Sequence, residues 1–95
     1  MLGANSTSYC FVTGYGTLTP ENPHHRPSDA LATTMTGMLV GGANFNLEDP
    51  YAKNVLTGKP AAKCYVDNAQ SYSYNEITIY WNSPLIYLMA GFMAD

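Results

Sequence analysis

Charged side chains are scarce in this chain of 95 residues, since four Lys and Arg and seven Asp and Glu make up 12% of it. A typical soluble domain carries about twice that share, roughly 25%. Hydrophobic residues reach 46%, although a small domain has little interior in which to bury them. We therefore expect one small domain at most, with apolar surface that a partner segment covers.

The low charge and the lack of long apolar runs also exclude classes of partner. A net charge of −3 with only four basic residues argues against nucleic acid, because a phosphate track needs many cations. No run reaches 18 apolar residues, so we expect no membrane-spanning segment. The N-terminus has neither a basic region nor an apolar core, so no signal peptide is visible in this chain.

Cysteine is also sparse, with only Cys10 and Cys64 present. Neither has another Cys or a His two to four residues away, which excludes the usual metal-binding spacing. We expect both to be buried thiols, with a Cys10–Cys64 disulfide as the alternative in an extracellular setting. We expect no metal ion and no cofactor.

Prolines and glycines divide the chain into short elements. Three prolines predict a loop over residues 17–27, because each removes a backbone donor and disfavours helix in the preceding residue. A short helix capped by Ser28 is predicted over residues 28–36. A strand-like apolar segment is predicted over residues 38–40, and residues 44–60 are expected to be rich in turns.

An acidic pair lies in the turn-rich region, at Glu48 and Asp49. A calcium site uses about six to eight oxygen ligands, and one pair of carboxylates supplies too few of them. We therefore interpret both side chains as solvated charges.

The longest apolar run covers residues 84–94 and predicts a helix. Asn82 or Ser83 would cap it, with Pro84 at the first helical position, where its missing N–H is tolerated. Its apolar residues cover nearly every face, which is typical of a buried helix.

Residues 65–83 form the stretch with the most chemistry, and Glu76 lies near its middle. Two acids, Asp67 and Glu76, are flanked by five aromatic residues: Tyr65, Tyr72, Tyr74, Tyr80 and Trp81. Because Ile-Thr-Ile-Tyr-Trp follows Glu76, we expect its carboxyl to stand beside apolar and aromatic surface. Such surroundings raise a carboxyl pKa, as a general acid near neutral pH requires. The alternative is a glutamate at a helix start that only complements the helix dipole.

The pattern Tyr-x-Asp-x4-Tyr-x3-Glu-x-Thr-x3-Asn-Ser over residues 65–83 resembles an active-site segment of glycoside hydrolase family 9. A second segment, residues 9–16 with Pro-His-His-Arg at residues 23–26, resembles the family as well. Between them, residues 38–44 are similar to its Leu-Val-Gly-Gly-Pro-Asn turn, with Ala43 replacing proline. The segments follow the family's order, and the resemblance covers nearly the whole chain.

The resemblance implies a mainly α fold, since the family comprises inverting cellulases built on an (α/α)6 barrel. Residues 1–95 would be the incomplete C-terminal segment of the catalytic domain, loop-rich with one buried terminal helix. The implied partners are β-1,4-glucan (cellulose or cello-oligosaccharides) and the missing N-terminal part of the barrel. The implied location is extracellular.

Glu76 matches the family's general acid, which protonates the leaving glycosidic oxygen. Asp67 belongs to the same segment and is assigned a supporting catalytic role. The family takes its catalytic base from an N-terminal aspartate pair that this chain does not contain, so the isolated chain is expected to be inactive. The alternative is a truncated, non-catalytic chain that binds carbohydrate weakly or needs a partner segment to fold.

His24 and Arg26 match the family positions that contact the sugar at and beside the cleavage point, with His24 among the catalytic candidates. Trp81 falls where the family often places a ring against the sugar, and Tyr72 is a lesser candidate for the same role. Leu18 departs from the family, which usually has Asn, Lys or Arg there. Without the resemblance, the His-His-Arg turn is interpreted as a solvated polar turn.

Overall fold

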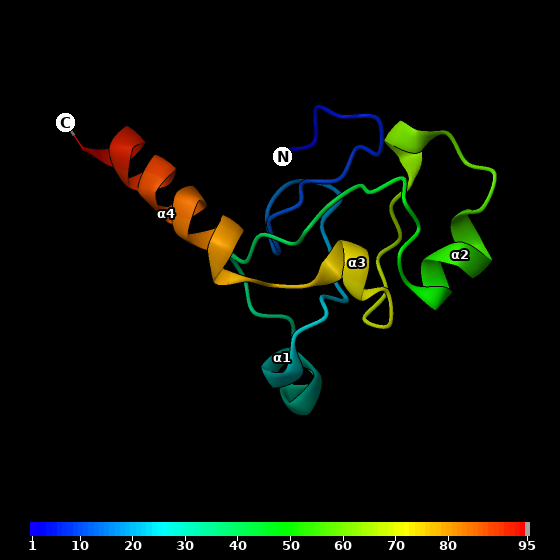
Figure 1. Cartoon of the computed structure of the whole chain (residues 1–95). Coiled ribbons are helices and arrows are strands. Elements are labelled where there is room, and N and C mark those ends of the chain that lie inside the picture. Colours follow the sequence, from blue (N-terminus) through cyan, green and yellow to red (C-terminus); the bar gives the residue numbers. More distant parts are fainter. Residues whose placement is uncertain (95) are drawn as a thin grey trace.

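The computed structural model describes residues 1–94, in which short helices are joined by long loops. The helical elements are α1 (Arg26–Leu31), α2 (Pro50–Leu56), a 3-10 turn (Ala61–Lys63), α3 (Tyr72–Asn75) and α4 (Ile79–Met93). Figure 1 shows α3 between α2 and α4, with α1 set apart below them. The described residues contain isolated backbone bridges but no longer strand, so a mainly α and loop-rich chain is confirmed.

The isolated bridges join segments that are distant in the sequence. Val12 pairs with Leu39, and Val40 pairs with Ile77, both in the antiparallel sense. The predicted strand-like segment at residues 38–40 therefore pairs with residues 9–16 on one side and with residues 65–83 on the other. This pairing brings the family-like segments of the chain side by side.

The core is small and rich in aromatic rings. Its buried members are Val40, Ala52, Leu56, Cys64, Tyr65 and Tyr74. The Tyr65 ring meets Tyr9 and Phe11 edge-on, with centroids 4.7 and 4.9 Å apart. Cys10 and Cys64 are buried and free, as predicted.

Helix α2 was not predicted, because residues 44–60 were expected to hold only turns. Asp49 caps it by accepting a 2.7 Å hydrogen bond from the Ala52 N–H, and Pro50 opens it. Asp at the cap and Pro at the first position are a recognised helix-start signal, and the sequence contained it. The interpretation of Asp49 as a solvated charge is therefore wrong, since its side chain is fully buried.

Helix α1 begins at Arg26, two residues before the predicted start, so Ser28 lies inside it and His25 stands at its cap. Pro27 falls in its first turn, where a missing N–H leaves no intrahelical bond unmade. The helix ends early at Ala32, which adopts a left-handed φ of 48°.

Helix α4 begins at Ile79, so the predicted start at Pro84 is wrong and this proline lies inside the helix. Asn82 does not cap it either. Its amide accepts from the Leu39 N–H at 2.8 Å and donates to the Leu39 carbonyl at 3.0 Å. This pairing fastens the first turn of α4 to the central segment and lets the helix start earlier.

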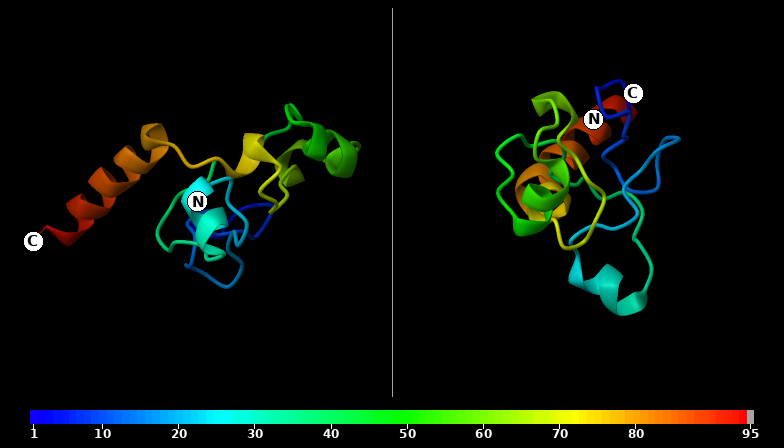
Figure 2. Two further views of the ribbon diagram at one scale, coloured as in Figure 1. Left: turned by 90° about the horizontal axis from the view of Figure 1, so that it is seen from below. Right: turned by 90° about the vertical axis from the view of Figure 1, so that its right-hand side faces the viewer.

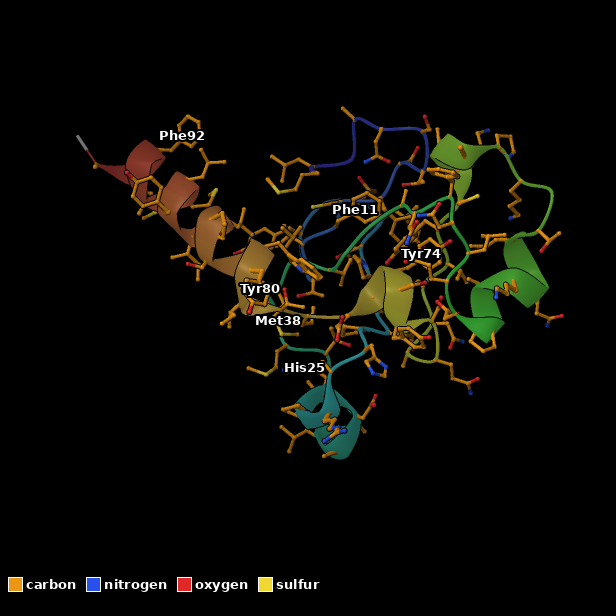
Figure 3. All side chains as sticks on the ribbon, viewed as in Figure 1. Phe11, His25, Met38, Tyr74, Tyr80 and Phe92 are labelled. Atoms are coloured by element: carbon orange, nitrogen blue, oxygen red, sulfur yellow. The ribbon has the colours of Figure 1, made fainter. Side chains whose placement is uncertain are left out.

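Helix α4 projects from the body of the chain in Figure 1 and in the left view of Figure 2. None of its residues is buried within residues 1–94; Tyr87 is 84% exposed and Phe92 is 77% exposed. Figure 3 shows Phe92 far from Phe11 and Tyr74, which lie in the body. The predicted terminal helix exists, but the part of the chain that the structure describes leaves it without a buried residue.

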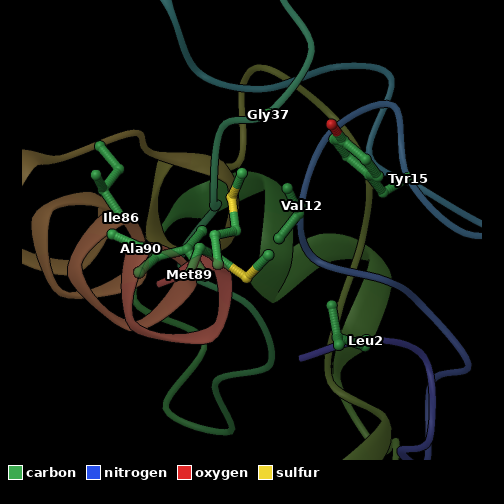
Figure 4. Close-up of a pocket in the computed structure, with 9 residues that line it drawn as sticks. Leu2, Val12, Tyr15, Gly37, Ile86, Met89 and Ala90 are labelled. Atoms are coloured by element: carbon green, nitrogen blue, oxygen red, sulfur yellow. The ribbon is translucent and has the colours of Figure 1, made fainter. Parts of the chain in front are cut away.

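One side of α4 borders an apolar groove. Met89 and Ile86 face Val12, Tyr15 and the N-terminal segment across it (Figure 4). None of the helices described over residues 1–94 combines the length and apolarity that crossing a membrane requires.

Asn75 is the hub of the polar interior and is fully buried. Its amide oxygen accepts from the Tyr65 hydroxyl at 2.7 Å. Its amide nitrogen donates to the carbonyls of Val66, Asn68 and Ser71 at 2.7, 3.0 and 3.1 Å. Burial, followed by the charge of Asp67, raises the pKa of the Tyr65 phenol, so its hydroxyl remains a donor.

We predict that Asn75→Ala lowers the free energy of unfolding by about 2 kcal/mol or more, because it removes the acceptor of the buried Tyr65 hydroxyl and the side-chain donor of the Val66 carbonyl. The measurement is urea unfolding followed by the fluorescence of Trp81. Asn54→Ala, on the exposed surface of α2, is the matched control and is expected to stay within about 0.5 kcal/mol of wild type. Equal effects of the two substitutions would contradict the role of Asn75.

We predict that the isolated chain self-associates through α4, because contiguous exposed apolar surface of this kind drives association. Tyr87→Lys with Phe92→Lys is expected to shift the chain toward monomer. The measurement is light scattering coupled to size-exclusion chromatography over a concentration series. Asn54→Lys with Gln70→Lys adds the same two charges at exposed polar positions and is expected to leave association unchanged. A wild-type chain that stays monomeric throughout would refute this prediction.

Candidate functional site

The backbones of His24 and Glu76 pair in a parallel bridge. The His24 N–H donates to the carbonyl of Asn75 at 2.8 Å, so the proline-rich loop is attached directly beside the candidate acid. Both side chains are exposed. The structure therefore brings together residues from the two segments that the sequence singled out.

Asp67 holds the same loop from a second point. Its two carboxylate oxygens accept from the backbone N–H groups of Glu21 and Asn22, at 2.8 and 2.9 Å. Charge-assisted bonds of this kind are stronger than neutral ones. Both oxygens of Asp67 are thus engaged by loop backbone, which suits a residue that positions the loop.

The His24 ring has a defined orientation. Its Nδ1 lies 2.6 Å from the carbonyl of Ala69, and since a carbonyl only accepts, Nδ1 carries the proton in this contact. Nε2 is then left for another partner. The Tyr72 ring lies edge-on to the His24 ring, with centroids 6.2 Å apart. Buried Pro23, next to His24, limits the freedom of the loop further.

Arg26 is exposed at the first position of α1. A cation in the first turn opposes the helix dipole, so its place is not explained by helix stability. His25, labelled in Figure 3, is engaged within α1, where its Nδ1 lies 2.8 Å from the Ser28 hydroxyl. Of these two neighbouring residues, Arg26 is the one whose side chain is exposed to solvent.

Glu76 directly follows the last residue of α3, with extended φ and ψ of −63° and 139°. The helix-start alternative is wrong, because this end of a helix disfavours a negative charge. The expected enclosure of Glu76 by apolar and aromatic surface is not provided by residues 1–94 either, since its side chain is exposed. The physical reason lies in α4, which starts at Ile79 and carries the exposed Tyr80 away from the body.

The two candidate sugar-stacking rings differ in their surroundings. Tyr72 is 45% exposed and lies beside His24, within the group around Glu76. Trp81 is half-buried, and its indole N–H donates to the Leu39 carbonyl at 3.0 Å. It lines a separate surface pocket with Phe11 and the Gly41-Gly42 turn.

The Gly41-Gly42 turn supports the segment that leads to Glu76. The Gly42 N–H donates to the Tyr74 carbonyl at 2.9 Å, with a φ of +85° that favours glycine. A Cβ on Gly41 would lie 3.3 Å from that same carbonyl oxygen. Sequence reasoning noted this pair only as a turn, although paired glycines also signal a close approach of two backbones.

Asn75 and Asp49 are the site-supporting residues that sequence reasoning missed. A buried Asn adjoining a candidate acid leaves no periodic signal, and the only signal at Asp49 was its position before a proline. Among residues 1–94, no group of three or more His, Cys, Asp or Glu side chains gathers as metal ligands would.

The sequence matches the family model described as Glycosyl hydrolase family 9 over residues 1–89. It is 43% identical over 96 residues to a cellodextrinase of Butyrivibrio fibrisolvens, covering 98% of this chain and 18% of that protein. It is 41% identical over 93 residues to a xyloglucan-specific endo-beta-1,4-glucanase of Bacteroides ovatus, covering 96% of this chain and 15% of that protein.

The fold matches a thermostable endoglucanase from Alicyclobacillus acidocaldarius with a TM-score of 0.83 and 41% identity, covering 98% of this chain and 18% of that one. A family 9 endoglucanase of known structure matches with a TM-score of 0.90 and 34% identity, over 99% of this chain and 18% of that one. The mainly helical chain thus matches part of the (α/α)6 barrel enzymes, and it spans less than a fifth of these relatives. The chain belongs to glycosyl hydrolase family 9.

Proposed function

We propose that this chain is the C-terminal segment of a family 9 catalytic domain and supplies its general acid and part of its sugar-binding surface. The observation that carries the proposal is the backbone bridge that sets His24 beside Glu76, with both side chains exposed. The reaction is hydrolysis of β-1,4-glucosidic bonds in cellulose or cello-oligosaccharides. The names of the relatives, cellodextrinase and endoglucanase, support this substrate class.

Glu76 gives its proton to the glycosidic oxygen as the bond from that oxygen to the anomeric carbon breaks. In an inverting enzyme, a second carboxylate takes a proton from the water that attacks the opposite face, and the two carboxyls lie about 6.5–9.5 Å apart. That base comes from the remainder of the domain. We do not assign Asp67 as the base, because both of its oxygens already accept from the backbone N–H groups of Glu21 and Asn22 and so tie it to the loop.

His24 and Arg26 bind hydroxyls of the sugar at and beside the cleaved bond. The hydrogen bond of Nδ1 to the Ala69 carbonyl fixes the His24 ring before the sugar binds. Nε2 is therefore already oriented, and less side-chain entropy is lost on binding. The Arg26 guanidinium donates two parallel hydrogen bonds to neighbouring oxygens. Tyr72 and Trp81 lie on either side of Glu76 in the sequence, and both offer ring faces to the apolar faces of sugars.

The remainder of the barrel is the partner that covers α4. Exposed Ile79, Tyr87 and Phe92 need an apolar contact that residues 1–94 do not provide. The complete protein acts outside the cell, where polymeric glucan is accessible. The same exposed helix favours a second candidate, a non-catalytic chain that binds carbohydrate weakly or folds only with a partner.

We predict that Glu76→Gln lowers hydrolysis of unactivated cellulose by about 10²-fold to 10⁴-fold, because the amide keeps the shape of the side chain but has no proton to give. The variant is made in a graft, the Butyrivibrio cellodextrinase with its matching segment replaced by this chain. Activity on aryl glycosides with good leaving groups is expected to survive better. Glu48→Gln, another exposed carboxyl, is the control, and equal losses on both substrates would contradict the role of Glu76.

In the same graft, we predict that His24→Ala and Arg26→Ala each reduce kcat by about tenfold or more, since they remove contacts that hold the sugar in its reactive form. The measurement is steady-state hydrolysis of short cello-oligosaccharides. His25→Ala removes a ring that bonds within α1 and is expected to have a smaller effect. If His24→Ala or Arg26→Ala has wild-type kinetics, the substituted residue does not bind the sugar as proposed.

We predict no hydrolysis by the isolated chain, because the base that takes a proton from water is absent from it. The measurement is release of reducing sugar from carboxymethylcellulose by the purified chain, with Glu76→Gln as the control for contaminants. Release that depends on Glu76 would mean that a base lies within these residues, with Asp67 the first candidate.

A further inference from the structure

Asp49 is a fully buried carboxylate for which the proposed reaction has no role. One of its oxygens accepts from the Ala52 N–H at 2.7 Å, which caps α2. The other accepts from the Ser71 hydroxyl at 2.7 Å and from the N–H of Ser73 at 3.3 Å. The Ser73 hydroxyl also donates to this second oxygen. The carboxylate therefore joins the start of α2 to the start of α3.

The electrostatics of this site favour the ionised carboxylate. Burial by itself raises the pKa of Asp49, but the hydrogen bonds from Ser73, Ala52 and Ser71 outweigh it, so the pKa lies below its ordinary value of 3.8. Asp49 therefore stabilises the fold above pH 3.8, and this contribution is lost as the pH falls through the lower folded-state pKa. At neutral pH the ionised Asp49 carboxylate accepts all of these hydrogen bonds.

Helix α3 connects this carboxylate to the candidate acid. Ser71 is its cap, Ser73 lies in its only turn, and Glu76 follows its last residue. The Glu76 N–H donates to the Tyr72 carbonyl at 3.1 Å, which closes the turn. A displacement of Ser71 and Ser73 therefore moves Glu76 with them.

Capping α2 accounts for only one oxygen of Asp49. An Asn side chain caps a helix about as well as Asp does, yet its NH₂ group cannot accept from the Ser73 N–H. The second oxygen, with its donors on α3, is what requires a carboxylate here. We propose that Asp49 is a positioning residue that holds α3, and through it the carboxyl of Glu76, in the geometry for proton transfer. This inference rests on the proposed function of Glu76.

The test is steady-state kinetics of the graft carrying Asp49→Asn, at a temperature where the variants are folded. We expect kcat to fall by about tenfold or more with KM within about twofold, because misplacement of a catalytic group costs turnover while the sugar contacts stay. Ser73→Ala removes one donor, the Ser73 hydroxyl, from the second oxygen and keeps the cap of α2. It is expected to lower kcat as well, and its effect is expected to be non-additive with that of Asp49→Asn.

Two controls separate positioning from stability. Ala52→Gly weakens α2 without removing a donor from the second oxygen of Asp49, and Glu48→Gln removes the neighbouring exposed carboxylate; both are expected to keep kcat. A kcat for Asp49→Asn equal to that of Ala52→Gly, or unchanged kcat for Ser73→Ala, would overturn the proposal. If Asp49→Asn fails to fold, the Ser73→Ala result decides the question. An unmutated graft that folds but is inactive, or that does not depend on Glu76, would instead refute the proposed function.

Discussion

The buried amide of Asn75 and its own carbonyl are the contacts on which the rest of this structure depends. The amide accepts from the Tyr65 hydroxyl and donates to three carbonyls of the loop over residues 66–71, which joins that loop to α3. The carbonyl accepts the His24 N–H and so attaches the proline-rich loop. Because the next residue is Glu76, the same side chain that satisfies the polar interior also sets the position of the candidate acid.

Hydrogen bonds hold the loops of this chain together because its hydrophobic core is small. Loops that pass through the interior must have their backbone groups paired, since an unpaired buried group costs about 1–3 kcal/mol. Asn75, Asp67 and Asp49 provide those pairings at three points around the candidate site. The apolar residues of α4 remain uncovered. The chain thus supplies its own hydrogen bonds around the candidate site. We attribute the apolar cover of α4 to the rest of the domain.

The spacing of the motifs predicted the family, because motif spacing is a local property of the sequence, and the family resemblance in turn implied the helical class. The resemblance gave His24 and Glu76 roles at the same sugar linkage, but the backbone bridge between them was not predicted, since no local pattern indicates which distant backbones meet. Helix α2 was missed although Asp49 and Pro50 signal a helix start. The early start of α4 could not be predicted, because it depends on Asn82 pairing with Leu39, a tertiary contact that outweighs the usual preference for Pro84 at the first turn.

We propose above that His24 and Glu76 act on one sugar linkage. The most direct measurement is a crystal structure of the Glu76→Gln graft bound to a cello-oligosaccharide. The account predicts that the side-chain amide introduced by this substitution lies within hydrogen-bond distance of a glycosidic oxygen and that His24 contacts an adjoining glucose unit. An oligosaccharide bound in the same barrel without contact to either position would contradict it.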